Sequence, residues 1–203
     1  MMILREEREV PEPPRREIFR YLGYKGTEPD EAIREAVERC VRELKEVSAP
    51  RSVSALFPLS REDDVLVVAG MHVHSRSLRR NLEGCSRVIL FAATLGLGPD
   101  RLISRASVRK PSEMLVYQAA AAAMIEEVCD QLNREWEERI RSEGDSLRPR
   151  FSPGYGDFAL EHQREFLQAI DAARGAGISL TESCLMVPSK SVSAVIGVIS
   201  DRG

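Results

Sequence analysis

The sequence has few of the residues that build metal centres and disulfide frameworks. Its 203 residues include four cysteines and three histidines, and no two cysteines form a Cys-x-x-Cys pair. That isolation argues against a zinc ribbon or a dithiol redox motif and predicts four reduced, mostly buried thiols. His72 and His74 could chelate a metal at a strand edge, but no third ligand is suggested nearby. We therefore expect no metal site.

Long apolar runs are also missing. No stretch reaches the roughly 20 apolar residues of a membrane span, and the longest apolar-rich run, residues 88–97, has the length of a strand. The opening Met-Met-Ile-Leu is followed at once by charged residues, so it falls far short of the apolar region of a signal peptide. We expect a cytoplasmic protein without a membrane segment.

An excess of basic charge is absent as well. Lys and Arg total 29, Asp and Glu total 32, and the formal net charge is −3. A general nucleic-acid binder needs a basic surface to displace counterions from phosphates, so that class is disfavoured. At about 150 residues per domain the length suits one large or two small domains. We expect an N-terminal arm over residues 1–26 and one domain over residues 27–203.

Apolar periodicity predicts clusters of helices and strands. One helix should start near Glu28, with Thr27 as its N-cap and Pro29 in its first turn. We expect further helices at 75–82, 112–141 and 161–173, and strands at 52–58, 65–69, 88–94, 178–187 and 191–199. Because they do not alternate regularly, we expect an α+β single domain with a largely antiparallel, bent sheet flanked by helices.

Several catalytic motifs are missing. The chain has no Gly-x-Gly-x-x-Gly, no P-loop and no Gly-x-Ser-x-Gly elbow. Gly96, Leu97 and Gly98 follow a predicted strand, but a third glycine in register is lacking. We interpret this segment as a turn at the end of the strand.

The segment from 148 to 158 contains more than a connecting loop requires. It has the sequence Arg-Pro-Arg-Phe-Ser-Pro-Gly-Tyr-Gly-Asp-Phe. The prolines restrict the backbone, and two glycines flank Tyr155 and leave backbone groups open beside its ring. Arg150 offers a planar donor fork suited to a carboxylate or phosphate. The loop could therefore hold a flat heterocycle with an anionic end. The alternative is a packed turn with a salt-bridged arginine.

A second segment, residues 180–193, has more hydroxyl groups than its turn requires. Ser189, Ser191 and Ser193 follow the turn expected at Pro188. The alternative is a buried strand, a turn and a second strand.

The run from Arg150 to Tyr155, with Glu161 and His162 after it, resembles the activation domain of cobalamin-dependent methionine synthase. That domain binds S-adenosylmethionine through an Arg-x-x-x-Gly-Tyr segment. Residues 180–183 and 191–193 are similar to the terminal hairpin of the family. Residues 21–26 and 91–96 are similar to its stand-alone members, so the resemblance covers nearly the whole chain.

The resemblance implies a binding site for S-adenosylmethionine at Glu126, Arg150, Phe151, Ser152, Gly154 and Tyr155. Arg150 would hold the methionyl carboxylate, and Glu126 on the long helix would lie near the ammonium or sulfonium. Phe151, Ser152 and Gly154 would offer backbone contacts near the adenine, and Tyr155 would shape the pocket. The chain departs from the family at Gly156, where the full-length enzymes have proline, and at residues 194–197, where they carry an aromatic pair.

By the same resemblance, the chain would be a reactivation subunit that supplies the methyl group for reductive methylation of cob(II)alamin. Its partner would be a cobalamin-dependent methionine synthase lacking its own activation domain, with a flavodoxin-like reductant as a candidate electron donor. The chain has no Asp-x-His-x-x-Gly motif, so cobalamin must be on the partner. Catalysis would come from positioning, as an accessory subunit rather than an enzyme alone. The alternative is a non-catalytic sensor of S-adenosylmethionine or another small ligand. A free-standing methyltransferase is disfavoured because no other acid or base stands out.

Overall fold

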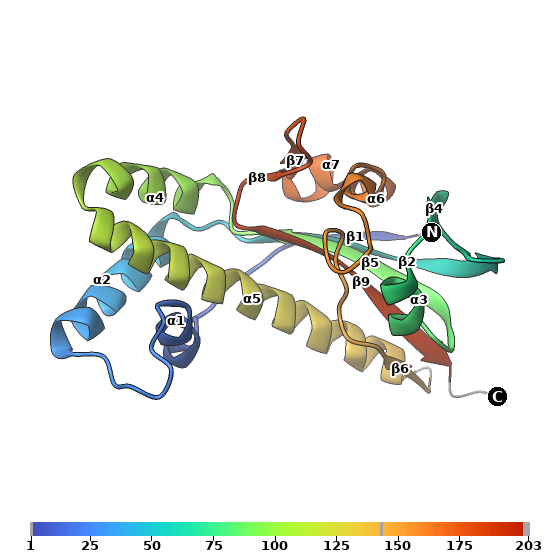
Figure 1. The fold of residues 1–203 in the computed structure, drawn as a ribbon, viewed down its shortest axis with the longest axis horizontal. Coiled ribbons are helices and arrows are strands. Elements are labelled where there is room, and N and C mark those ends of the chain that lie inside the picture. The colour runs from blue at the N-terminus through green and yellow to red at the C-terminus, as the bar shows by residue number, and fades with distance from the viewer. Residues whose placement is uncertain (1, 143, 201–203) are drawn as a thin grey trace.

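Strand β5 (Cys85–Thr94) lies in the middle of an open antiparallel sheet (Figure 1). The computed structural model describes residues 2–142 and 144–200. The other sheet strands are β1 (Ile3–Glu7), β2 (Arg51–Glu62), β3 (Val65–Val68), β4 (Met71–Val73), β6 (Asp145–Leu147) and β9 (Ser191–Ser200). Their order is β4-β3-β2-β5-β9-β6, and β1 pairs with the first half of β2. Every pairing is antiparallel among the described residues, which confirms the expected α+β fold.

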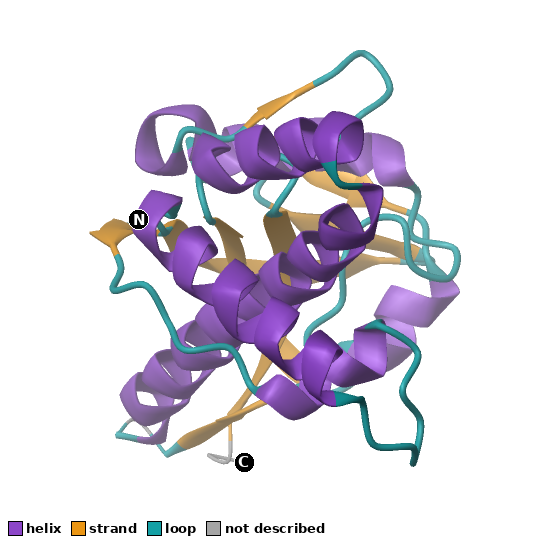
Figure 2. Cartoon of the chain, turned by 90° about the vertical axis from the view of Figure 1, so that its left-hand side faces the viewer, coloured by secondary structure: helices purple, strands orange, loops and turns teal. Residues whose placement is uncertain are grey.

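Helices cover both faces of the sheet. They are α1 (Arg15–Tyr21), α2 (Glu31–Val47), α3 (Arg76–Asn81), α4 (Leu97–Arg109), α5 (Pro111–Arg141), α6 (Gln163–Ala169) and α7 (Ala172–Ala176). The 3-10 turn η1 (Leu160–His162) leads into α6, and β7 (Ser179–Leu180) pairs with β8 (Met186–Val187) in a separate hairpin. Seen from the left of Figure 1, several helices lie in front of the strands (Figure 2).

Side chains along β5 point alternately to the two faces of the sheet, and the apolar core accordingly forms two clusters. Ile89 and Phe91 face α2, α4 and α5, whereas Val88 and Leu90 face α6, α7 and the β2–β4 end of the sheet. Successive side chains of a strand point to opposite faces, so one buried strand contributes to both cores. This explains why residues 88–93 are almost continuously apolar.

The long helix α5 crosses one face of the sheet and contacts α1, α2 and α4. Residues 119–123 of this helix are all alanine, and all but Ala122 are buried, Ala120 and Ala121 completely. Small side chains let neighbouring elements approach the helix axis closely. None of the helices in the described part of the chain is long and apolar enough to cross a bilayer.

The sequence-based boundaries need correction at the helix that follows the N-terminal segment. Asp30, not Thr27, is its N-cap, because the Asp30 carboxylate accepts a hydrogen bond from the Ile33 N–H at 2.9 Å. The helix therefore begins at Glu31.

Two further predictions also need correction. The helix expected at 161–173 is interrupted, since Asp171 adopts a left-handed conformation between α6 and α7. The apolar run 178–187 is not a strand beside β9; it folds back on itself as the β7–β8 hairpin.

The segment after β5 was interpreted as a turn alone, but it opens helix α4. Gly98 lies in the first turn of α4, where an added Cβ would sit 2.0 Å from the Val47 carbonyl oxygen. Glycine is therefore required by the close approach of α4 to the end of α2, and no phosphate-binding role is needed to explain it.

Candidate functional site

The candidate site lies along a free stretch of the edge of β9. One edge of β9 pairs with β5 over its length, whereas the other pairs with β6 at Val198–Ser200 and forms one bridge between Phe151 and Val195. Among the described residues, nothing pairs with this second edge over residues 191–194. A cavity of about 680 Å³ opens there, within the range typical of small-molecule sites.

The cavity brings together segments that are far apart in the sequence. Its walls come from α5, the loop after β6, η1 and α6, the β7–β8 hairpin and the start of β9. Five of the six expected site residues line it, namely Glu126, Arg150, Phe151, Ser152 and Tyr155. Gly154 belongs to the same loop but is not part of the wall.

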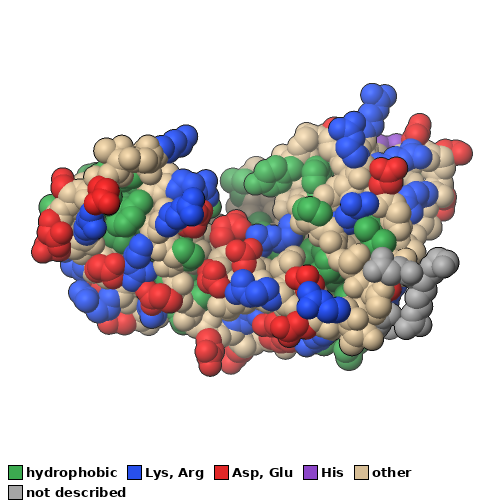
Figure 3. Space-filling view, turned by 90° about the horizontal axis from the view of Figure 1, so that it is seen from below, with side chains coloured by type: hydrophobic (Ala, Val, Ile, Leu, Met, Phe, Trp, Pro, Cys, Tyr) green, Lys and Arg blue, Asp and Glu red, His purple; other side chains and the backbone are tan. Residues whose placement is uncertain are grey.

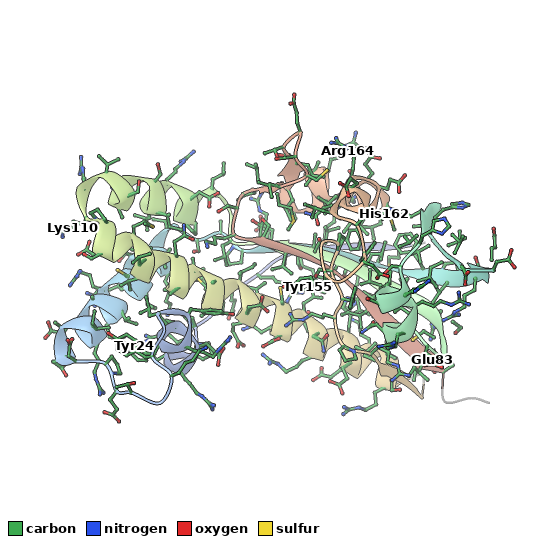
Figure 4. The ribbon with its side chains drawn as sticks, in the orientation of Figure 1. Tyr24, Glu83, Lys110, Tyr155, His162 and Arg164 are labelled. Atoms are coloured by element: carbon green, nitrogen blue, oxygen red, sulfur yellow. The ribbon has the colours of Figure 1, made fainter. Side chains whose placement is uncertain are left out.

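The loop from 151 to 158 is held by its own backbone. The Phe151 N–H donates to the Val195 carbonyl at 2.9 Å, and the Gly154 N–H donates to the Phe158 carbonyl at 2.7 Å. The Phe158 ring is buried and stacks on the Phe151 ring at 6.4 Å. Of the three residues expected to offer backbone contacts near the adenine, Phe151 and Gly154 thus have their N–H groups hydrogen-bonded within the protein. Tyr155, labelled in Figure 4, is 67% exposed beside β9 at the rim of the cavity.

Asp157 anchors this loop to the start of α3. Its carboxylate accepts hydrogen bonds from the Ser75 hydroxyl at 2.6 Å and from the backbone N–H groups of Arg76 and Ser77 at 2.8 and 3.0 Å. These donors, the Ser75 hydroxyl first, favour the charged form and hold the pKa of Asp157 well below its ordinary value. This loop is therefore attached to the start of α3 by charge-assisted hydrogen bonds.

Gly156, where the sequence was expected to depart from the family, has a backbone conformation that proline cannot adopt. Its φ is +56°, and an added Cβ would lie 2.7 Å from the Ser77 hydroxyl oxygen. Proline is restricted to a φ near −65° and cannot adopt this backbone. Glycine at 156 therefore allows the close approach of the loop to α3 that the Asp157 hydrogen bonds require.

Arg150 lies between two carboxylates of α5. Its Nη2 donates to Asp130 Oδ1 at 2.8 Å and to Glu126 Oε2 at 3.2 Å. Its Nη1 is buried and has no hydrogen-bond partner among the described residues. The guanidinium is thus fixed by one nitrogen while a second donor nitrogen is unused. Sequence reasoning did not single out Asp130, although its i, i+4 spacing from Glu126 places both carboxylates on one helix face.

Cys129, next to Asp130, does not supply a nucleophile to this site. Burial raises the pKa of its thiol to about 12. The thiol is therefore neutral near pH 7, and the reactive thiolate is not formed.

The serines of the second segment each have a partner. Ser189 donates its N–H to Asp100 of α4 at 2.8 Å, and the Ser191 hydroxyl contacts the Thr94 hydroxyl at 2.8 Å. The Ser193 hydroxyl donates to Gln163 Oε1 at 3.0 Å, inside the cavity wall. Gln163, which follows His162 (labelled in Figure 4), lines the cavity, and sequence reasoning did not single it out. A polar side chain at the start of an amphipathic helix was the available signal.

The histidine pair and the surface charge are the other two features that could indicate a metal site or a charged binding surface. His72 lies in β4 and His74 follows the end of that strand, and the described residues contain no group of three or more His, Cys, Asp or Glu able to hold a metal ion. Acidic and basic side chains are interspersed over the face drawn in Figure 3. Such mixing is typical of an ordinary solvated surface.

Comparison with known proteins finds similarity in structure only. No protein-family model matches the sequence, and no curated protein matches it. Among solved structures, the chain is similar to the crystal structure of the MetH reactivation domain bound to AdoHcy, with a TM-score of 0.70 and 17% sequence identity. The alignment covers 100% of this chain and 80% of that one. The chain therefore shares the fold of that reactivation domain over its whole length.

Proposed function

We propose that this protein is an S-adenosylmethionine-binding reactivation module that serves a cobalamin-dependent methionine synthase. The observation that carries the proposal is the cavity beside β9, whose wall contains Glu126, Arg150 and the loop that matches the Arg-x-x-x-Gly-Tyr pattern. The shared fold with a domain solved with AdoHcy supports the same class of ligand. The sequence pattern and the shared fold both favour a domain of this kind.

The polar groups of the cavity fit the amino-acid end of this ligand. Arg150 would bind the carboxylate with its guanidinium, which Asp130 and Glu126 hold at the cavity wall through Nη2. Glu126 is half-exposed at the cavity wall and would favour the ammonium and sulfonium cations. The ligand supplies a methyl group on a positively charged sulfur, and this chain contributes its binding and orientation.

Cobalamin would be on the partner, since the chain carries no cobalamin motif. The exposed side chains of Tyr155 and Leu185 at the cavity wall leave the cavity open to an approaching surface. A docking contact that must release in each cycle is expected to be of modest area.

Calorimetric titration of the purified chain with S-adenosylmethionine and with S-adenosylhomocysteine tests the ligand assignment. We expect saturable one-site binding of both. Absence of binding for both ligands by the folded chain would refute the proposal.

A second experiment separates a reactivation module from a sensor. The chain is mixed with a cobalamin-dependent methionine synthase lacking its own activation domain, and the cob(II)alamin absorbance is followed while one component is omitted at a time. We expect loss of that absorbance only when this chain, S-adenosylmethionine and a one-electron reductant are all present. Loss of the cob(II)alamin absorbance without this chain would favour the sensor. So would ligand binding by the chain with no loss of that absorbance on a cognate synthase.

A further inference from the structure

We propose that Gln163 is the residue that selects adenine in this cavity, through hydrogen bonds from its side-chain amide to the purine edge. The inference deepens the proposed function and rests on it, since it assigns the specificity of the same site. It concerns a residue for which the family motif provides no role.

Gln163 is an unusual residue for the wall of a cavity. It is only 4% exposed, although glutamine is mostly a surface residue. Its Oε1 accepts from the Ser193 hydroxyl at 3.0 Å, and its Nε2 donates to the Cys184 carbonyl at a long 3.4 Å. A primary amide can accept two hydrogen bonds and donate two. Each of the two amide atoms therefore has one partner in the protein and keeps one hydrogen-bonding position for a ligand.

Backbone N–H groups on the loop at 151–154 offer few alternative hydrogen bonds to a ligand in this part of the cavity. The N–H groups of Phe151 and Gly154, on the facing loop, are bonded to Val195 and Phe158. Hydrogen-bonding directions alternate along a strand, so Ser193 presents its backbone groups toward the same edge as Val195. That edge is the free stretch that borders the cavity. Gln163 thus lies on the wall at the part of β9 with open hydrogen-bonding positions.

The amide matches adenine and mismatches its deaminated form. Oε1 and Nε2 present an acceptor beside a donor, which complements the amino group and adjacent ring nitrogen of adenine. Hypoxanthine carries an oxo group in place of the amino group, so the donor that Oε1 would accept from is lost. A buried amide held by Ser193 and the hairpin cannot reorient freely to compensate. The site should therefore discriminate between two ligands that differ only at purine position 6.

The experiment compares S-adenosylhomocysteine with S-inosylhomocysteine by calorimetric titration of the full chain. We expect the wild type to bind the adenosyl compound about tenfold to a hundredfold more tightly, the range for a two-bond contact to a base. Gln163→Leu should reduce this preference to less than about threefold, mainly by weakening the adenosyl compound. Gln168→Leu is the matched control, because Gln168 lies on the same helix but outside the cavity, and it should retain the wild-type preference.

Ser193→Ala provides a second variant with little change in volume. It removes the hydroxyl that fixes Oε1, and we expect an intermediate preference. The wild-type comparison needs no variant, so the inference stays testable if Gln163→Leu does not fold.

The outcomes separate this inference from the proposed function. Tight wild-type binding of both compounds with equal affinity would refute the role of Gln163 and leave the ligand assignment intact. An undiminished preference in Gln163→Leu would do the same. Failure of the wild type to bind either compound would overturn both.

Discussion

The contact between Arg150 and the ligand carboxylate is the most direct test of the site. The side chain is about three-quarters buried, with an exposure of 26%, so solvent weakens its interactions less than at a surface. Hydrogen bonds to charged groups contribute about 1.5–3 kcal/mol. Since about 1.4 kcal/mol is a factor of ten, Arg150→Ala should weaken S-adenosylmethionine binding roughly tenfold to a hundredfold.

Two neighbours increase the expected loss. Without the guanidinium, the carboxylates of Glu126 and Asp130 lose their shared cation, which is 3.2 and 2.8 Å away, and they then oppose a ligand carboxylate. Arg150→Lys keeps a positive charge but removes the planar fork, so it should restore only a small part of the affinity.

The assay uses a second ligand to isolate the carboxylate. Methylthioadenosine has the adenosyl group but no amino acid, so Arg150→Ala should change its binding little. Isothermal titration of both ligands into wild type and variant gives four affinities, and the ratio of the two losses is the informative quantity. Equal losses would refute the carboxylate assignment and make Arg150 a structural residue of the loop. Unchanged S-adenosylmethionine binding would refute it as well.

Three further predictions test the surrounding framework. Glu126→Gln should weaken the binding of S-adenosylmethionine more than that of methylthioadenosine in the same titrations. Glu127→Gln, at a position outside the cavity, should have little effect on either. Equal losses of affinity for the two ligands in Glu126→Gln would contradict the charge argument. Asp157→Ala should lower both the thermal stability and the ligand affinity. Because the pKa of Asp157 is lowered in the folded protein, the stability difference between wild type and variant should be complete above about pH 3.9 and should decline as the pH falls through the folded pKa. A stability difference that persists in acid would contradict this reasoning. Trp136→Phe should lower the free energy of unfolding in urea by about 1–3 kcal/mol, because the indole N–H that donates to the Ser54 hydroxyl at 3.0 Å is lost and that hydroxyl stays buried. Adding Ser54→Ala should recover part of the lost stability, and strictly additive effects of the two substitutions would argue against the contact.

Local sequence signals were sufficient for the main elements. The apolar spacing of α5 and the continuous apolar run of β5 follow directly from which side chains must be buried. The α4 segment was missed because Gly96, Gly98 and Pro99 are typical of a turn, and only the close approach to Val47 explains the glycine within a helix. The helical signal was present further along the segment, because the buried residues Pro99, Leu102, Ile103 and Ala106 follow i, i+3, i+4, i+7 spacing.

The candidate site was partly available from sequence in the same way. The prolines, glycines and arginine of residues 148–158 mark an unusual loop, since each residue type restricts or opens the backbone by itself. By contrast, Asp157 and Gly156 have meaning only beside the start of α3, about 80 residues earlier in the chain.

The sequence by itself therefore determined the α+β class, the long helix and the loop that carries Arg150, because these depend on local residue chemistry and burial. Only the tertiary structure decided that this loop meets Asp130 and that Gln163 is buried against Ser193. It also decided that, in the described part of the chain, no strand pairs with one edge of β9 over residues 191–194. The physical reason is that a cavity and its hydrogen-bond partners arise where distant segments pack together. No residue in such a set carries a signal of its partners in its own neighbourhood of the chain.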